Sequence, residues 1–203
     1  RINYEMRGNG TPILFLHPVG LGGTFWEPEM AVLENDYRVI SIDFRGHGGS
    51  EVPTSPFTLE DLADDVQEIL HCSGACPAIV VGLSLGGMVA QILAIRHPES
   101  VAGLVLADTL YNVSPSLAEA LDQRAKKAME QGMEAIIEET LTRWFSPRFL
   151  RFAPRIVSAV REDLLKCDPM VHGWTWQAIK QLDMDKDLGR IHVPVLVVVG
   201  EKD

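Results

Sequence analysis

Short apolar runs rich in Val, Ile and Leu alternate with amphipathic stretches along this chain. Residues 13–16 are fully apolar, which is typical of a strand that is covered on both faces. The segments that predict strands are residues 2–6, 13–16, 39–42, 79–81, 101–107 and 195–199. Strands that alternate with helices predict an α/β fold, with a mostly parallel sheet that carries helices on both faces.

Two helices between these strands have clear sequence signals. Thr58 and Asp61 form a capping box, and apolar residues then recur at helical spacing through residues 59–70 until Gly74. The second helix follows Ser84, is apolar on nearly all sides, and is expected to end before Pro98. This second helix should therefore be the most buried one.

The strand pattern disappears between residues 113 and 187, where four helical patterns follow one another. The sequence thus predicts an α/β core in residues 1–112, a helical cap in residues 113–187 and a continuation of the core in residues 188–203. A helical insertion between core strands is expected to cover the carboxyl edge of the sheet, where ligands bind. The alternative is a packing subdomain that does not contact substrate.

Ser84 stands between a strand and a helix in the segment Gly82-Leu83-Ser84-Leu85-Gly86. This pattern and its context predict a nucleophile elbow, in which the serine hydroxyl is exposed at the carboxyl edge of the sheet. The glycines remove side chains that would collide in so tight a turn. The alternative interpretation is an ordinary tight turn between strand and helix.

A glycine-rich loop, residues 17–23, follows the strand at residues 13–16. Such a loop can present backbone N–H groups to an oxyanion, and we expect the N–H groups of Val19 and Leu85 to be the two donors. His17 at the end of the strand is suited to fixing this loop. A merely flexible loop is the alternative.

Two aspartates are candidates for the acid of a catalytic triad. Asp203 follows the last predicted strand and comes after Ser84, as the order serine, aspartate, histidine requires, and Asp108 ends the strand at residues 101–107. We favour Asp203. No histidine within the chain is a convincing base, so we expect the catalytic histidine beyond residue 203, in a longer protein of which this sequence is a fragment.

Composition narrows the class of protein further. The net charge of −10 argues against nucleic acid or an anionic membrane as the partner, and no apolar run reaches transmembrane length. Three cysteines, an odd number, suit a reducing compartment, and we expect a cytoplasmic location. No Walker loop, dinucleotide fingerprint or metal-ligand spacing is present, so we expect neither a cofactor nor a metal.

These motifs together resemble those of the α/β-hydrolase superfamily. Residues 17–20 stand where that family has its oxyanion loop, residues 43–50 are similar to its D-x-R-G-x-G-x-S turn, and residues 82–87 match its elbow. Residues 82–91, 106–109 and 141–147 more narrowly resemble the 3-oxoadipate enol-lactonase group. The resemblance implies an α/β-hydrolase fold with a helical cap; members with an aspartate nucleophile are disfavoured by Ser84.

The leading hypothesis is a serine hydrolase that acts on a small-molecule carboxylic ester or lactone. An enol-lactone of the oxoadipate type carries a carboxylate, so a cation in the pocket is needed, and Arg143 beside Trp144 is the candidate. Arg143 could equally be a solvated arginine of the cap. The alternatives in function are a general carboxylesterase or cofactor-free perhydrolase, and, in another class, a non-catalytic binding or receptor protein.

Overall fold

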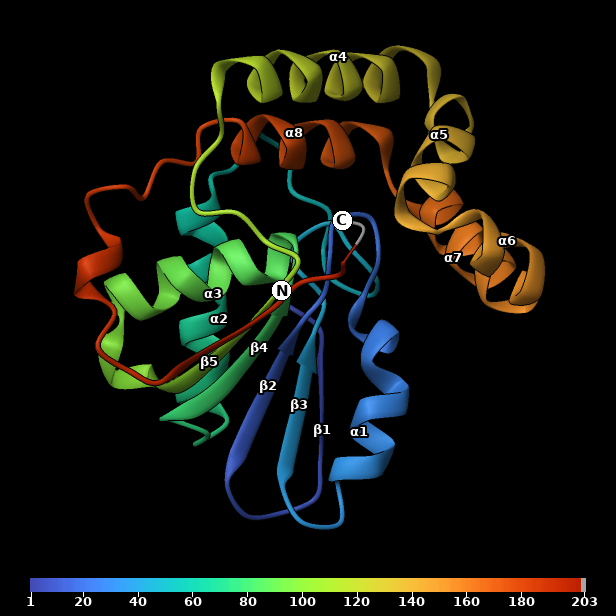
Figure 1. Cartoon of the computed structure of the whole chain (residues 1–203). Helices are drawn as coiled ribbons and strands as arrows, with labels where there is room; N and C mark the ends of the chain where they lie inside the picture. Colours follow the sequence, from blue (N-terminus) through green and yellow to red (C-terminus); the bar gives the residue numbers. More distant parts are fainter. Residues whose placement is uncertain (202–203) are drawn as a thin grey trace.

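The computed structural model describes residues 1–201, which form a twisted sheet with helices around it (Figure 1). The six strands of the sheet in this part of the chain lie in the order β1-β3-β2-β4-β5-β6. Only β1 runs antiparallel to its neighbour, so the mostly parallel sheet predicted from the sequence is confirmed. The strands are β1 (Tyr4–Arg7), β2 (Pro12–Leu16), β3 (Arg38–Ile42), β4 (Ala78–Leu83), β5 (Val101–Ala107) and β6 (Val195–Val198).

Helices cover both faces of the sheet, and alternate side chains of β2 serve the two faces. Leu14 and Leu16 pack in the large cluster with α2 (Leu59–Cys72) and α3 (Leu85–Arg96). Ile13 and Phe15 pack on the opposite face with Trp26 and with α1 (Glu27–Leu33). The sequence analysis missed α1, because this short helix buries only one side chain and so lacks an apolar stripe.

The capping box before α2 is confirmed. The N–H of Asp61 donates to the hydroxyl oxygen of Thr58 at 3.1 Å, and the N–H of Thr58 donates to the Asp61 carboxylate at 2.8 Å. The helix α3 is buried along residues 85–95, as its uniform apolar character predicts. Within residues 1–201, no helix combines the length and the apolar character that are needed to cross a bilayer.

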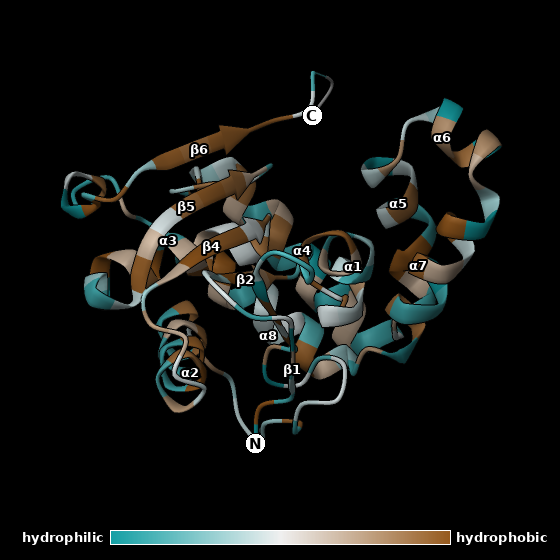
Figure 2. Cartoon of the chain, turned by 90° about the horizontal axis from the view of Figure 1, so that it is seen from below, coloured by the Kyte–Doolittle hydropathy of each residue, from teal (hydrophilic) through white to brown (hydrophobic). Residues whose placement is uncertain are grey.

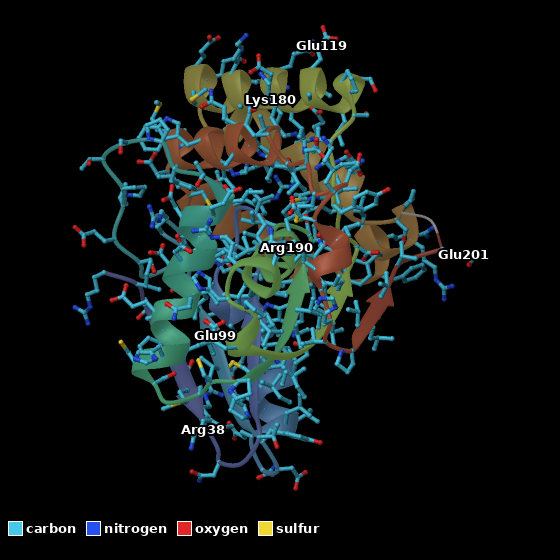
Figure 3. The ribbon with its side chains drawn as sticks, turned by 90° about the vertical axis from the view of Figure 1, so that its left-hand side faces the viewer. Arg38, Glu99, Glu119, Lys180, Arg190 and Glu201 are labelled. Carbon is cyan, nitrogen blue, oxygen red and sulfur yellow. The ribbon has the colours of Figure 1, made fainter. Side chains whose placement is uncertain are left out.

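A helical insertion, defined here as α4 to α8, separates β5 from β6. Figure 1 shows α4 lying along α8 above the carboxyl ends of the strands. Lys180, labelled in Figure 3 just after α8, donates to the carboxylate of Asp122 in α4 at 3.0 Å. The helices of the insertion are α4 (Pro115–Gln131), α5 (Glu134–Trp144), α6 (Pro147–Phe152), α7 (Pro154–Lys166) and α8 (Pro169–Ile179).

The sequence predicted four helical patterns in this region and missed α6. That helix is six residues long and buries no side chain, so it has no periodic apolar signal. Its start is marked by Ser146, whose hydroxyl oxygen accepts a hydrogen bond from the N–H of Phe149, and by Pro147 at its first position. Such start signals are weak beside a full apolar stripe.

The strand β6 forms one edge of the sheet and is apolar on both sides. Its side chains are exposed, with Val197 67% accessible, and Figure 2 shows this edge as a hydrophobic strand. The predicted strand at residues 195–199 is correct apart from its last residue, because β6 ends at Val198. Because β6 runs parallel to β5, the chain leaves it at the carboxyl ends of the strands, where β4 and β5 also end.

Candidate active site

Ser84 occupies the sharp turn between β4 and α3. Its backbone angles, φ 52° and ψ −111°, lie in a region that residues with a side chain rarely adopt. Holding a residue there costs about 1–3 kcal/mol, which the surrounding structure must offset. The Ser84 N–H donates to the carbonyl of Ala107 at 2.9 Å, and the Thr109 hydroxyl donates to the Ser84 carbonyl at 2.7 Å. The end of β5 thus holds the turn in place.

Two glycines allow the backbones of β2, β4 and α3 to meet at this turn. A Cβ atom on Gly82 would collide with the carbonyl of Gly86, and a Cβ atom on Gly86 would collide with the carbonyl of Leu16. These obstacles are backbone atoms, which cannot rotate out of the way. The glycine spacing in the sequence therefore marks a close approach of three elements, as the elbow interpretation requires.

Ser84 lines a cavity of about 410 Å³ between the sheet edge and the helical insertion. A cavity of this size suits a small organic molecule. Among the residues that line it, Ser84 supplies a hydroxyl, Asp108 a carboxylate and Arg143 a guanidinium, and most of the others are apolar. The apolar part of the wall includes Pro18, Leu21, Phe25, Met88, Leu117, Leu121, Val160 and Ile179.

The two backbone donors predicted for an oxyanion hole come from the loop after β2 and from the elbow itself. Val19 follows β2 in a loop whose Pro18 lines the cavity, and Leu85 is the first residue of α3. Among the described residues, no turn or loop hydrogen bond uses either N–H. The first N–H groups of a helix have no partner within the helix, so Leu85 is available as a donor. Their role stays a prediction.

His17 is completely buried beneath this loop. The Phe44 N–H donates to its Nε2 at 3.0 Å, and its Nδ1 lies 2.8 Å from the Pro18 carbonyl. Burial and the neighbouring His47 lower the pKa of His17 to about 3, so the ring is neutral near pH 7. A neutral ring that accepts at Nε2 must carry its proton on Nδ1 and donate it to Pro18.

Asp43 and His47 belong to the turn after β3, within residues 43–50 that resemble the family's D-x-R-G-x-G-x-S turn. The Asp43 carboxylate accepts from the N–H of Gly23 at 2.6 Å and from the N–H of Gly49 at 2.8 Å. The His47 Nδ1 lies 3.2 Å from the carbonyl of Arg45. The bond from Gly23 to Asp43 joins the loops after β2 and β3. Neither Asp43 nor His47 lines the cavity, so both stabilise the loops beside it.

Arg143 and Trp144, predicted as substrate-binding residues, both line the cavity from the end of α5. The guanidinium carbon of Arg143 lies 5.9 Å from the centre of the Trp176 ring, which lines the cavity from α8. The buried Arg124 lies over the same ring at 5.2 Å, and burial lowers its pKa. The sequence analysis missed Trp176 and Arg124, because nothing local shows that α4, α5 and α8 converge.

The structure describes only one of the two candidate acids of the triad, Asp108. Asp108 lines the cavity just after β5, and its carboxylate accepts a hydrogen bond from the N–H of Gly200 at 2.9 Å. Its φ of 40° shows a second strained residue at this edge of the sheet. Asp203, the favoured acid, lies outside the described residues.

No histidine within residues 1–201 forms a hydrogen bond with Ser84. His97, at the far end of α3, pairs with Asp64 at 2.7 Å. His172 is buried in α8, where its Nε2 accepts from the indole N–H of Trp176 at 2.9 Å. In the same part of the chain, no three His, Cys, Asp or Glu side chains are grouped as metal ligands.

Comparison with known proteins agrees with this geometry. Residues 11–203 match the alpha/beta hydrolase fold family. The chain is 32% identical to 3-oxoadipate enol-lactonase 2 of Acinetobacter baylyi, in an alignment that spans all of this chain and 76% of that protein. Among solved structures it resembles the enol-lactonase from Burkholderia xenovorans LB400, at 30% identity and a TM-score of 0.93, over 98% of this chain and 78% of the other.

A second solved structure is similar to the same extent. It is a thermophilic esterase from Thermogutta terrifontis, with 30% identity and a TM-score of 0.92 over 98% of this chain and 75% of that one. The fold and the match along nearly the whole chain define a class, the α/β hydrolases. This chain belongs to the α/β-hydrolase fold family, and within that family it is a hydrolytic enzyme with enol-lactonase-like relatives.

The close approach at Gly82 leads to a stability prediction. Replacement of Gly82 by alanine should lower the free energy of unfolding by about 3 kcal/mol, because the new methyl group meets backbone atoms. The control is Gly103→Ala in β5, where a Cβ meets nothing nearer than the Pro194 carbonyl at 3.4 Å. Urea unfolding of both variants measures the difference. Equal losses would show that the elbow is no more crowded than the rest of the sheet.

The buried histidines predict a loss of stability in mild acid. Burial lowers the pKa of His17 and of His172 to about 3, from 6.5, and it lowers the pKa of His47 as well. Below pH 6.5 the unfolded chain therefore binds more protons than the folded chain. The contribution of these neutral histidines to the free energy of unfolding is complete above pH 6.5 and is lost as the pH falls toward 3.

We expect the free energy of unfolding to fall by about 1 kcal/mol or more between about pH 7.5 and about pH 5.5, where most carboxylates stay ionised. Urea unfolding at the two pH values measures this change. His17→Asn removes one of the titrating rings and should reduce the pH dependence. A free energy of unfolding that does not change over this interval would contradict the prediction.

Proposed function

We propose that the protein is a serine hydrolase that cleaves a carboxylic ester or a lactone, with Ser84 as the nucleophile. The observation that carries the proposal is the strained backbone of Ser84 at the edge of a cavity of about 410 Å³. A serine held in such a turn presents its hydroxyl to the cavity. The N-terminus of α3 adds a positive potential where negative charge develops during attack.

The chemistry follows from these groups. The Ser84 oxygen attacks the carbonyl carbon of the substrate and gives its proton to a base, while the carbonyl electron pair moves onto the oxygen. The N–H groups of Val19 and Leu85 stabilise this oxyanion. The bond to the leaving oxygen then breaks, that oxygen takes the proton, and an acyl-enzyme remains. Water attacks the acyl carbon in the same way and regenerates the serine.

The base in this scheme is the histidine that the sequence analysis expects beyond residue 203, and Asp203 orients it. The carboxylate of Asp108 is already engaged with the N–H of Gly200. This bond supports a structural role for Asp108, in which it holds the backbone at Gly200, just after β6. Asp108 is the alternative acid, because it lies at the cavity.

The helical insertion acts as a cap in this proposal, with residues 1–112 and 188–203 as the core and residues 113–187 as the cap. Support comes from the cavity wall, to which α4, α5, α7 and α8 all contribute side chains. A wall shared by sheet edge and insertion fits a small-molecule substrate. The alternative is an insertion that only packs on the core, and it predicts no cavity wall that the insertion and the sheet share.

We propose an enol-lactone of the oxoadipate type as the substrate, with Arg143 as the partner of its carboxylate. The similarity to two enol-lactonases and the guanidinium at a mainly apolar cavity support this choice. Trp144 and Trp176 would form the apolar wall beside that cation. The similarity to a thermophilic esterase supports the second candidate, hydrolysis of a neutral carboxylic ester.

Ser84→Ala in the full-length protein should abolish ester hydrolysis and labelling by a fluorophosphonate, because both need the activated hydroxyl. Mass spectrometry of the labelled wild-type protein should locate the adduct on Ser84. Ser116→Ala, on the exposed side of α4, is the control and should behave as the wild type. An adduct on another serine would disprove the role of Ser84, and no adduct and no turnover at all would favour a non-catalytic protein.

Arg143→Ala should lower kcat/KM for a carboxylate-bearing lactone about 10- to 150-fold, the worth of a hydrogen bond to a charged group, about 1.5–3 kcal/mol. The same change should hardly affect a neutral ester of similar size. Arg148→Ala is the matched control, since both arginines are exposed but Arg148, on α6, does not line the cavity. Equal losses on the charged and the neutral substrate would remove the argument for an anionic substrate.

A further inference from the structure

The peptide unit between Pro18 and Val19 carries the donor that the proposed mechanism needs on the β2 side. In a trans peptide the carbonyl and the following N–H point in opposite directions, because the unit is planar. Whatever holds the Pro18 carbonyl therefore also sets the direction of the Val19 N–H. A rotation of this plane would turn the donor away from the oxyanion and reduce its effect.

His17 holds that carbonyl. Its Nδ1 is 2.8 Å from the Pro18 oxygen, and the longer bond from the Leu21 N–H, at 3.4 Å, is the only other one that this oxygen accepts among the described residues. The Phe44 N–H fixes the ring from the other side by donating to Nε2. Because Nε2 is thereby an acceptor, the ring has one tautomer, and Nδ1 is its donor.

The rest of the loop is fixed from the insertion. Gly20 has a φ of +79°, and a Cβ there would lie 2.7 Å from Leu164 of α7. The Gly20 carbonyl accepts a hydrogen bond from the thiol of Cys167 at 2.9 Å. The loop thus has little freedom after Val19, and the direction of the peptide before Val19 depends on His17.

We propose that His17 is a positioning residue, which keeps the Val19 N–H directed at the oxyanion by donating from Nδ1 to the Pro18 carbonyl. The inference rests on the proposed function, because it assigns a purpose to the hydrogen bond only if Ser84 generates an oxyanion. His17 lines no part of the cavity, so it acts through the peptide and never touches the substrate.

Two variants of His17 separate positioning from simple stability. Asparagine can place an amide N–H where the Nδ1–H of histidine lies, so it keeps the bond to Pro18 and leaves the Phe44 N–H without its acceptor. Glutamine can place an amide oxygen near the position of Nε2, so it keeps the bond to Phe44 and loses the donor to Pro18. Each variant removes one buried hydrogen bond, and urea unfolding should give similar losses for the two.

The full-length protein is assayed with the ester that it hydrolyses best. His17→Gln should lower kcat about 10- to 100-fold, approaching the effect of losing an oxyanion donor, with KM changed less than about twofold. His17→Asn should keep kcat within about threefold of the wild type. Inhibition by phenylboronic acid, whose adduct with serine is a tetrahedral anion, should weaken with glutamine in proportion to kcat. Equal kcat values for the two variants, or unchanged boronate inhibition, would overturn the proposal.

Ser84→Ala distinguishes failure of this inference from failure of the proposed function. If Ser84→Ala still turns over substrate, the proposed function is wrong. If Ser84→Ala is inactive but the two His17 variants are alike, only the role of His17 is wrong. A further measurement uses the wild type, so it does not depend on whether a variant folds. Nitrogen-15 spectra of the His17 imidazole should show the proton on Nδ1. A proton on Nε2 would disprove the arrangement.

Discussion

The close approach of three backbones at Ser84 is the constraint on which the rest of the structure depends. Gly82 and Gly86 bring the ends of β2 and β4 against the start of α3, where any side chain would collide with a carbonyl. This contact forces Ser84 into its unusual backbone conformation and brings the N-terminus of α3 to the sheet edge. The burial of α3 stabilises this arrangement, since its eleven buried residues offset the cost of one strained residue.

The loops around the elbow are held by polar contacts that are almost entirely buried. His17 bonds both Pro18 and Phe44, and the carboxylate of Asp43 bonds the backbone of Gly23. These bonds connect the segments after β2 and β3, which are neighbours in the sheet but distant in the sequence. A buried network of this kind is rigid because each unpaired group would be costly. The rigidity suits a site in which backbone N–H groups, not mobile side chains, are expected to stabilise charge.

The sequence predicts features that depend on neighbouring residues well. It predicts poorly which side chains meet when distant helices pack together. The glycines around Ser84, the Thr58 capping box and the strands β2 to β5 depend on neighbours in the chain, and the structure agrees with these predictions, whereas β1 and β6 at the two edges of the sheet are largely exposed. The short helices α1 and α6 were missed because they bury too little to produce a pattern. Trp176 and Arg124 were missed because their place depends on how α4 packs along α8, which no local signal encodes.

The charge of the site shows why net charge is a poor guide to the substrate. The chain carries −10 overall, yet the guanidiniums of Arg124 and Arg143 flank the Trp176 ring at the cavity wall. Exposed charges more than about 8 Å away are screened at physiological salt, whereas the largely buried side chain of Arg124 is screened much less. Burial lowers the pKa of Arg124, while Glu139, 3.5 Å away, counteracts that shift and helps to keep the positive charge. An anion that enters this cavity therefore responds to Arg143, which lines its wall, more than to acidic groups that lie beyond the screening distance.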